Sequence, residues 1–263
     1  GYVLSSESCA LDAIKAEFIR HIDPGEMVII DDSGVRSVIY AEPEKIDKKL
    51  CVFEYIYFAR PDSVICGQSV HEARLEAGRI LAREHPAEAD VVIGVPDSGL
   101  DAAMGYAEAS GIPYGEGFVK NRYIGRTFIT PDQKSRENAV RLKLGALKSQ
   151  VAGKRVVMID DSIVRGTTSR QIISLLRDAG ATEVHFRVSS PTFISPCYFG
   201  TDIPDKENLI ACHHSVEEIR QMTGADSLGF LSTQALDHLA PQAACGFCKG
   251  CFTERYPVET PQA

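Results

Sequence analysis

The stretch from Val156 to Ser169 constrains the fold more than any other part of the sequence. It begins with four apolar residues, three of them β-branched, which is typical of a strand buried on both faces of a parallel sheet. Asp160 and Asp161 end this strand, and the turn Gly166-Thr167-Thr168-Ser169 opens an amphipathic helix. The apolar residues of that helix recur at helical spacing and end before Gly180, where a helix stop is expected: Ile172, Ile173, Leu175, Leu176 and Ala179.

This order of elements suits a ligand that carries both phosphate and hydroxyl groups. Free backbone N–H groups at a helix start attract phosphate, and the hydroxyls of the serines and threonines between 162 and 169 add donors. Asp160 and Asp161 are suited to accept hydrogen bonds from sugar hydroxyls or to meet Mg²⁺, which prefers oxygen ligands. The alternative is a strand that ends in solvated acids before an ordinary helix cap, and the whole run argues against it. Neither a dinucleotide-binding Gly-x-Gly-x-x-Gly nor a P-loop pattern occurs.

The composition narrows the class of protein. A hydrophobic share of 44% and a charged share of 24% are those of an ordinary soluble protein, and no apolar run has the length of a membrane span. The formal net charge of −8 argues against non-specific nucleic-acid binding. The N-terminus shows no secretion leader, so we expect a cytoplasmic protein whose eight cysteines are free thiols or metal ligands rather than disulfides.

The first 45 residues predict a strand at 2–4, a helix to about residue 21, and a hairpin with strands at 27–30 and 35–40. So few elements do not easily form a stable domain, and we expect 1–45 to be the end of a domain whose larger part is absent. A charged linker at 42–49 leads into a second domain, 46–263.

In the second domain strands and helices alternate. This predicts an α/β fold with a parallel sheet, helices on both faces and ligands at the carboxyl ends of the strands. The strands are expected at 51–63, 91–95, 114–119, 155–159 and 183–189, and the helices at 70–85, 100–110, 138–150 and after Gly166.

Two further loops follow predicted strands. The turn Val95-Pro96-Asp97-Ser98-Gly99 enters a helix and exposes N–H groups that suit a pyrophosphate, although an ordinary structural turn is the simpler interpretation of it alone. The loop from Lys120 to Pro131 gathers Lys120, Arg122 and Arg126. We interpret it as a lid over an anionic substrate rather than as a solvated basic loop.

The cysteines near the C-terminus indicate metal binding. Cys245, Cys248 and Cys251 have Cys-x-x-Cys spacing, and a complete site would have to recruit distant thiols, with Cys51 and Cys197 the best candidates. The remaining three, Cys9, Cys66 and Cys212, are expected to be structural. Spacing alone leaves structural zinc and an iron–sulfur cluster both open.

The run 156–169 resembles the phosphoribosyl pyrophosphate (PRPP) signature of type I phosphoribosyltransferases. Together with the runs 54–63 and 120–129, it is similar to the amidophosphoribosyltransferase family, and in particular to its iron–sulfur branch. The resemblance covers essentially the whole chain and implies a type I phosphoribosyltransferase fold. It also implies that 1–45, with Ser8-Cys9-Ala10-Leu11-Asp12, is the C-terminal remnant of an N-terminal-nucleophile glutaminase domain.

The resemblance implies a role for each site residue. Asp160 and Asp161 would hold the ribose hydroxyls and Mg²⁺, with Ser98 as a further Mg²⁺ contact. The 5′-phosphate would lie on the segment Ser162 to Thr168, whose contact residues are Ser162, Arg165, Gly166, Thr167 and Thr168. Lys120, Arg122 and Arg126 would close over pyrophosphate. A 4Fe-4S cluster would be bound by Cys51, Cys197, Cys248 and Cys251.

Two features complicate the cluster assignment. Glu254 stands where the resembling segment has glycine, which weakens the local match. Cys245 is then a spare thiol, and Cys245 with Cys248 is the competing Cys-x-x-Cys pair.

The implied reaction is transfer of phosphoribose from PRPP to ammonia, giving 5-phosphoribosylamine in the first step of purine synthesis. In the family the ammonia comes from glutamine through an N-terminal cysteine, which this sequence does not contain, so no glutaminase activity is expected of it. Family members are usually homotetramers inhibited by purine nucleotides. The alternatives are a purine-sensing regulator, which would need a DNA-binding module that is not visible, and a salvage transferase that uses a purine base.

Overall fold

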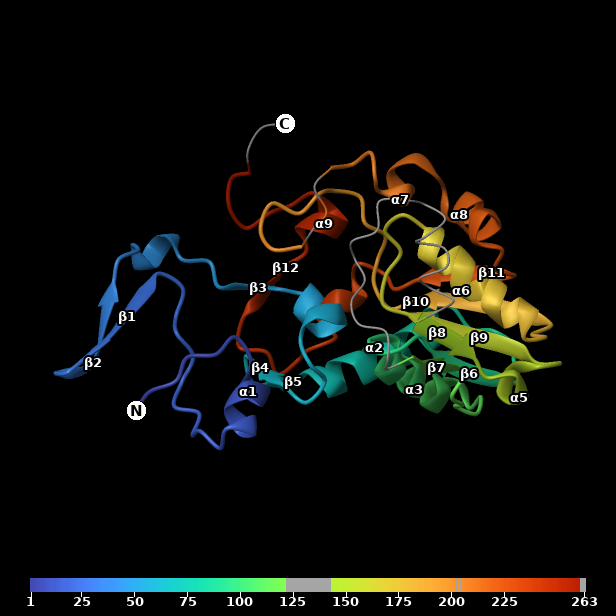
Figure 1. Ribbon diagram of the computed structural model, residues 1–263. Helices are drawn as coiled ribbons and strands as arrows, with labels where there is room; N and C mark the ends of the chain where they lie inside the picture. Colours follow the sequence, from blue (N-terminus) through green and yellow to red (C-terminus); the bar gives the residue numbers. More distant parts are fainter. Residues whose placement is uncertain (122–142, 202, 204, 261–263) are drawn as a thin grey trace.

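The centre of the protein is a four-stranded parallel sheet, seen in a computed structural model that describes residues 1–121, 143–201, 203 and 205–260 (Figure 1). The strand order is β11-β10-β9-β6, and every neighbouring pair is parallel. The strands are β6 (Val91–Gly94), β9 (Arg155–Asp160), β10 (Glu183–Val188) and β11 (Ser227–Phe230). The signature strand β9 lies between β6 and β10, which explains why its residues read as continuously apolar.

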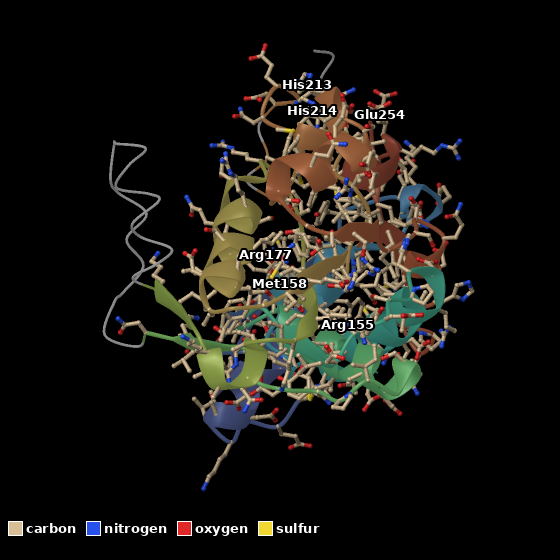
Figure 2. All side chains as sticks on the ribbon, turned by 90° about the vertical axis from the view of Figure 1, so that its right-hand side faces the viewer. Arg155, Met158, Arg177, His213, His214 and Glu254 are labelled. Carbon is tan, nitrogen blue, oxygen red and sulfur yellow. The ribbon has the colours of Figure 1, made fainter. Side chains whose placement is uncertain are left out.

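Helices cover both faces of this sheet, as predicted (Figure 1). On one face lie α2 (Val70–Glu84) and α3 (Gly99–Ser110), and on the other α6 (Thr167–Asp178) and α8 (Val216–Thr223). Alternate residues of β9 serve the two layers: Val157 and Ile159 join the core of α2 and α3, while Val156 and Met158 join that of α6. Met158 is fully buried within this packing (Figure 2).

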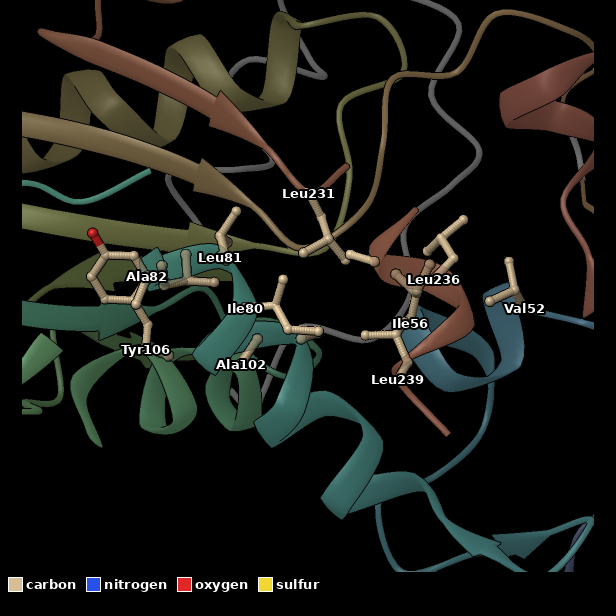
Figure 3. Packing of buried hydrophobic residues seen from close by; sticks show 14 of the residues in the cluster. Val52, Ile56, Ile80, Leu81, Ala82, Ala102, Tyr106, Leu231, Leu236 and Leu239 are labelled. Carbon is tan, nitrogen blue, oxygen red and sulfur yellow. The ribbon is translucent and has the colours of Figure 1, made fainter. Parts of the chain in front are cut away.

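The core on the α2 side extends beyond the sheet. Figure 3 shows residues of α2 and α3, such as Leu81 and Tyr106, in one cluster with Val52, Ile56 and Leu239 from distant parts of the chain. This cluster therefore fixes the segments before α2 and after β11 against the central domain.

Smaller elements surround the central sheet. In the described part of the chain, eight short strands form four two-stranded sheets, of which β1–β2, β4–β5 and β7–β8 are antiparallel and β3–β12 is parallel, and short helices lie between them. Their bounds are α1 (Ser8–Ala13), β1 (Glu26–Asp31), β2 (Gly34–Ile39), η1 (Pro43–Lys45), β3 (Lys49–Cys51), η2 (Glu54–Phe58), β4 (Val64–Ile65), β5 (Gln68–Ser69), β7 (Phe118–Lys120), β8 (Leu144–Ala146), α5 (Lys148–Val151), α7 (Ile210–His213), η3 (Ala235–Asp237), β12 (Gly246–Cys248) and α9 (Gly250–Thr253). Among the described residues, no helix combines the length and apolar character that a membrane crossing requires.

The N-terminal hairpin β1–β2 forms as predicted and lies apart from the central sheet (Figure 1). Its apolar side chains are largely uncovered, since Met27, Ile30, Val35 and Val38 are 41–47% exposed. The segment before the hairpin is tied to the rest of the chain through Glu7, whose carboxylate accepts hydrogen bonds of 2.8 Å from the Arg60 N–H and the Ser63 hydroxyl. The proposed domain boundary near residue 45 stays a prediction.

Several predicted elements differ from the structure. Residues 2–4 form no strand, because no neighbouring strand pairs with them among the described residues, and the helix that follows is only Ser8–Ala13. The aromatic run expected as a strand over 51–63 is a single π-helical turn, Glu54–Phe58, after the short β3. Of the helix expected over 138–150, residues 138–142 lie outside the described residues; residue 143 is helical, Leu144–Ala146 is a strand paired with β7, and Lys148–Val151 is helical. In the last two cases tertiary packing overrides local preference.

Candidate functional site

The two acids of the signature lie at the carboxyl edge of the sheet, where β9 ends. Asp160 and Asp161 are only 9% and 8% exposed, and the Asp161 N–H donates a 2.9 Å hydrogen bond to Asp160 Oδ1. The hydroxyls of Ser98 and Ser162 both donate to the Asp161 carboxylate. The structure thus brings together the four residues predicted to meet ribose and Mg²⁺ or to begin the phosphate segment.

Burial sets the electrostatics of this acid pair. It raises the pKa of Asp160 well above its ordinary value, and the neighbouring Asp161 charge adds to the effect. Burial also raises the pKa of Asp161, against the opposing hydrogen bonds from Ser162 and Ser98 and the charge of Arg74. Two carboxylates removed from water at one strand end would gain from a divalent cation, so the donor set fits Mg²⁺.

Arg74 is a buried cation whose charge acts on Asp161, and it was not predicted from the sequence. It lies on the buried face of α2, is 4% exposed, and donates to the carbonyl oxygens of Tyr55 at 2.9 Å and Ala59 at 2.7 Å. Burial lowers its pKa, while the charges of Asp101 and Asp161 oppose that shift. A lone cation between Ala73 and Ala77, on the apolar side of a predicted helix, is the signal that could have identified it.

The loop from Val95 to Gly99 is held against the end of β9. The Val95 N–H donates to the Ile159 carbonyl at 2.8 Å, and a Cβ on Gly99 would lie 2.5 Å from that same oxygen. Only glycine allows this close approach, which places Ser98 beside Asp161. The Pro96–Asp97 peptide bond in this loop is cis. Position 99 was read in sequence only as part of a turn.

The start of α6 has the form expected of an anion site. Its N-cap residue, Gly166, has a φ of 76°, and no side chain caps the helix. Arg165, Thr167 and Thr168 are exposed beside it. The first N–H groups of a helix have no acceptor within the helix, so these backbone donors and two hydroxyls face one region next to the acids.

The predicted lid lies only partly within the described residues. Lys120 ends β7, and its ammonium pairs with Asp97 of the loop before α3. The partner acid precedes Ser98, so this cation lies on the same side of the sheet as the acid pair. Arg122 and Arg126 lie outside the described residues, and the lid stays a prediction.

A second site is a cavity of about 580 Å³ lined by four cysteines, Cys51, Cys197, Cys248 and Cys251. The parallel pairing of β3 with β12 sets Cys51 beside Cys248. The segment before Cys197 is held to Cys251, whose carbonyl accepts from the N–H groups of residues 194 and 195 at 3.0 and 3.2 Å. These four are the thiols that the family resemblance selected.

Backbone donors surround one of these sulfurs. The N–H groups of Phe199 and Thr201 each lie 3.4 Å from Cys197 Sγ. Burial disfavours the Cys197 thiolate, but these donors outweigh burial and lower its pKa below the ordinary value. Burial raises the pKa of Cys51 to about 11 and also raises the pKa of Cys251. A positively charged metal centre would stabilise the thiolate forms, so these cysteines would lose their protons on binding it.

The spacing of the thiols bears on which metal fits. Across the described residues, no three histidine, cysteine, aspartate or glutamate side chains gather closely enough to bind a single metal ion. A tetrahedral zinc would need its thiolates about 2.3 Å from one point. A cubane cluster binds four thiolates at its separate corners and therefore spreads them more widely.

The remaining cysteines are placed elsewhere. Cys9 is buried, and Cys212 donates to the Ile194 carbonyl at 3.3 Å, which agrees with structural roles. Cys245 is not among the described residues that line the cavity. Glu254, the departure noted in the sequence, has a φ of 60° at the end of α9 and pairs with Lys206. Glycine would adopt this conformation without strain, so the positive φ explains why the resembling segment has glycine at this position.

Comparisons with known proteins agree with this geometry. Residues 70–190 match the phosphoribosyl transferase domain family. The amidophosphoribosyltransferase of Archaeoglobus fulgidus is 54% identical over 99% of this chain and 57% of its own length, and that of Bacillus subtilis is 55% identical over 98% and 55%.

Two solved structures are similar throughout. An allosteric regulatory enzyme of purine biosynthesis superposes with a TM-score of 0.89 at 54% identity, covering 98% of this chain and 56% of that one. The B. subtilis glutamine PRPP amidotransferase, in complex with ADP and GMP, gives a TM-score of 0.87 at 55% identity, covering 97% and 56%. The chain thus spans slightly more than half the length of the relatives it matches, and along that span it is homologous to the amidophosphoribosyltransferases.

Proposed function

We propose that this chain transfers the phosphoribosyl group of PRPP to ammonia and forms 5-phosphoribosylamine. The observation that carries the proposal is the buried pair Asp160 and Asp161, set between the Ser98 loop and the open start of α6. The acids at the end of β9 and the uncapped start of α6, six residues later in the sequence, suit a ligand with hydroxyls at one end and a phosphate at the other.

Different residues contact different parts of the substrate. Asp160 and Asp161 accept hydrogen bonds from the ribose hydroxyls, and with Ser98 they would bind Mg²⁺. The start of α6, with Arg165, Thr167 and Thr168, binds the 5′-phosphate. When bound, Mg²⁺ neutralises charge on the departing pyrophosphate. Lys120 lies where it would add positive charge on that side.

The displacement itself needs little from the protein beyond positioning. As the bond to pyrophosphate breaks, positive charge develops on the sugar ring, and the nearby carboxylates stabilise it. Ammonia is already a nucleophile, so the residues here need not supply a strong base. Lid residues 120–131 would exclude water, which would otherwise hydrolyse the activated sugar.

We also propose that Cys51, Cys197, Cys248 and Cys251 bind a 4Fe-4S cluster. The four thiols around one cavity and the N–H donors to Cys197 support a metal centre here, and the family resemblance favours a cluster over structural zinc. The cluster would be structural, since its cavity belongs to a different part of the chain from the acid pair.

The other parts of the proposal follow from the family. Residues 1–45 would be the end of a glutaminase domain that supplies ammonia from glutamine. Purine nucleotides would inhibit, as suggested by the ADP and GMP bound to the B. subtilis relative. A homo-oligomeric state and a cytoplasmic location stay predictions.

The test uses the chain with PRPP, MgCl₂ and ammonium chloride, and measures pyrophosphate release. We expect release that depends on all three components. Release that requires adenine, guanine or hypoxanthine in place of ammonia would instead establish the salvage reaction. No release with any acceptor, from protein that binds PRPP, would favour the regulator.

A further inference from the structure

The turn between β4 and β5 has an unusual residue at its tip. The two strands pair from Val64–Ser69 and Ile65–Gln68, so the connection is only Cys66-Gly67. Both have positive φ, 49° and 85°, which is the conformation of a type I′ hairpin turn. Asparagine, aspartate or glycine is strongly preferred at the first position, and cysteine there is an exception.

The same turn packs against the segment that precedes β12. The Ala244 N–H donates to the Cys66 carbonyl at 3.1 Å, and the Gln242 N–H donates to Gln68 Oε1 at 3.2 Å. These two bonds fix the backbone of 66–68 beside that of 242–244. Cys245 is the next residue, and its thiol lies close enough to that of Cys66 to contribute to the raised pKa of Cys66.

This thiol pair is separate from both sites described above. Neither residue lines the four-cysteine cavity among the described residues, and both side chains are partly exposed. Burial, together with the contact to Cys245, raises the pKa of Cys66 to about 11. A disulfide requires two cysteines whose backbones lie close together, and the bond from the Ala244 N–H to the Cys66 carbonyl brings these two segments together.

We propose that Cys66 and Cys245 are an oxidative modification site, which low-molecular-mass disulfides convert to a reversible Cys66–Cys245 disulfide. In the first step one thiol of the pair, as thiolate, attacks the small disulfide, forms a mixed disulfide and releases one small thiolate. In the second step the other thiol, after losing its proton to solvent, displaces the second small thiolate. The protein loses two electrons and two protons, and the small disulfide is reduced to two thiols.

The bond would join two parts of the chain that matter for the cysteine cavity. Cys245 lies three residues before Cys248, in the segment that leads into β12, and β5 leads directly into α2. A disulfide here would tie the segment before β12 to the β4–β5 turn. It would also stabilise the fold, because it closes a long loop in the unfolded chain.

The experiment treats the purified full chain with oxidised glutathione under anaerobic conditions. Free thiols are then blocked by alkylation, and the products are mapped by mass spectrometry of the intact protein and of its peptides. We expect loss of two alkylatable thiols, a peptide pair linked through Cys66 and Cys245, and full reversal by dithiothreitol. Cys66→Ser should abolish the linked pair, whereas the matched control Cys212→Ser should retain it.

Other pairings would overturn the proposal. A disulfide from Cys245 to Cys248 or Cys251, stable glutathione adducts on Cys66 and Cys245, or unchanged thiol loss in Cys66→Ser would each contradict it. Iron content, measured on the same untreated samples, tests the cluster proposal independently. Cys66→Ser should leave that content unchanged, so failure of one proposal is distinguishable from failure of the other.

Discussion

The acid site and the cysteine cavity are assembled in different ways. The acid site is built mainly on one β–loop–α unit, β9 to α6, and a neighbouring loop contributes Ser98. The cavity draws its thiols from three segments, around Cys51, Cys197 and Cys248–Cys251. Chemistry contained in one unit can be read from a contiguous run of residues, whereas the cavity exists only once distant segments have packed.

Among the variants, Asp160→Asn should have the most unequal effects on the two sites. The change keeps the shape of the side chain but removes the charge that would meet the ribose and Mg²⁺, so pyrophosphate release with ammonia should fall by about 10²–10³-fold. Iron content and the circular dichroism spectrum should stay as in the parent. Near-normal turnover would contradict the assignment of the site.

The reciprocal change is Cys251→Ser. Loss of one cluster thiolate should reduce iron from about four atoms per chain to less than about one, with loss of the visible absorbance of the protein. Cys245→Ser is the matched control in the same segment and should retain the iron. Metal analysis of the parent that finds zinc without iron would replace the cluster by a zinc site.

Alanine substitutions of two glycines, one at each site, test how tightly the two sites are packed. In Gly99→Ala the new Cβ would lie 2.5 Å from the Ile159 carbonyl oxygen, so the free energy of unfolding should fall by about 1–3 kcal/mol. Gly200 lines the cysteine cavity, and a Cβ there meets nothing within 4 Å. Gly200→Ala should therefore change stability by less than about 0.5 kcal/mol. Urea denaturation measures both, and equal effects would show that the acid site tolerates movement of its loop.

The smallest effect is expected for Ser98→Ala. The variant removes one of the two hydroxyls that donate to Asp161, a loss of about 1 kcal/mol. The PRPP concentration at half-maximal rate should rise roughly fivefold, since each 1.4 kcal/mol is a factor of ten. Ser110→Ala, at the far end of α3, should leave this concentration unchanged. An unchanged value in Ser98→Ala would mean that the Ser98 hydroxyl does not act on the substrate.

The same contrast explains how much could be predicted. The order strand, acids, turn and helix over 155–178 is correct because burial on both faces and the glycine turn leave local marks in the sequence. Arg74 was missed because its role depends on the carbonyls of Tyr55 and Ala59, which become available only when the aromatic run folds into a π-helical turn. That run contains β-favouring residues, so local preference indicated a strand.

The cysteines show where local pattern stops. Spacing pointed to Cys245, Cys248 and Cys251 as one group, yet Cys245 lies with Cys66 and not among the cavity's described lining residues. The three-residue spacing of these cysteines carries no information on strand pairing. Cys248 lies beside Cys51 because β12 pairs with β3. The choice of four thiols came from family resemblance.

The pairing of β3 with β12 has a consequence for how the protein is made. Strand Lys49–Cys51 leaves the ribosome long before Gly246–Cys248, and every residue of the central sheet is synthesised between them. The sheet can therefore fold while its first flanking strand still lacks a neighbour. The four-cysteine cavity is therefore complete only when the last part of this sequence is present, because a chain that ends before residue 246 lacks β12 and two of the four thiols.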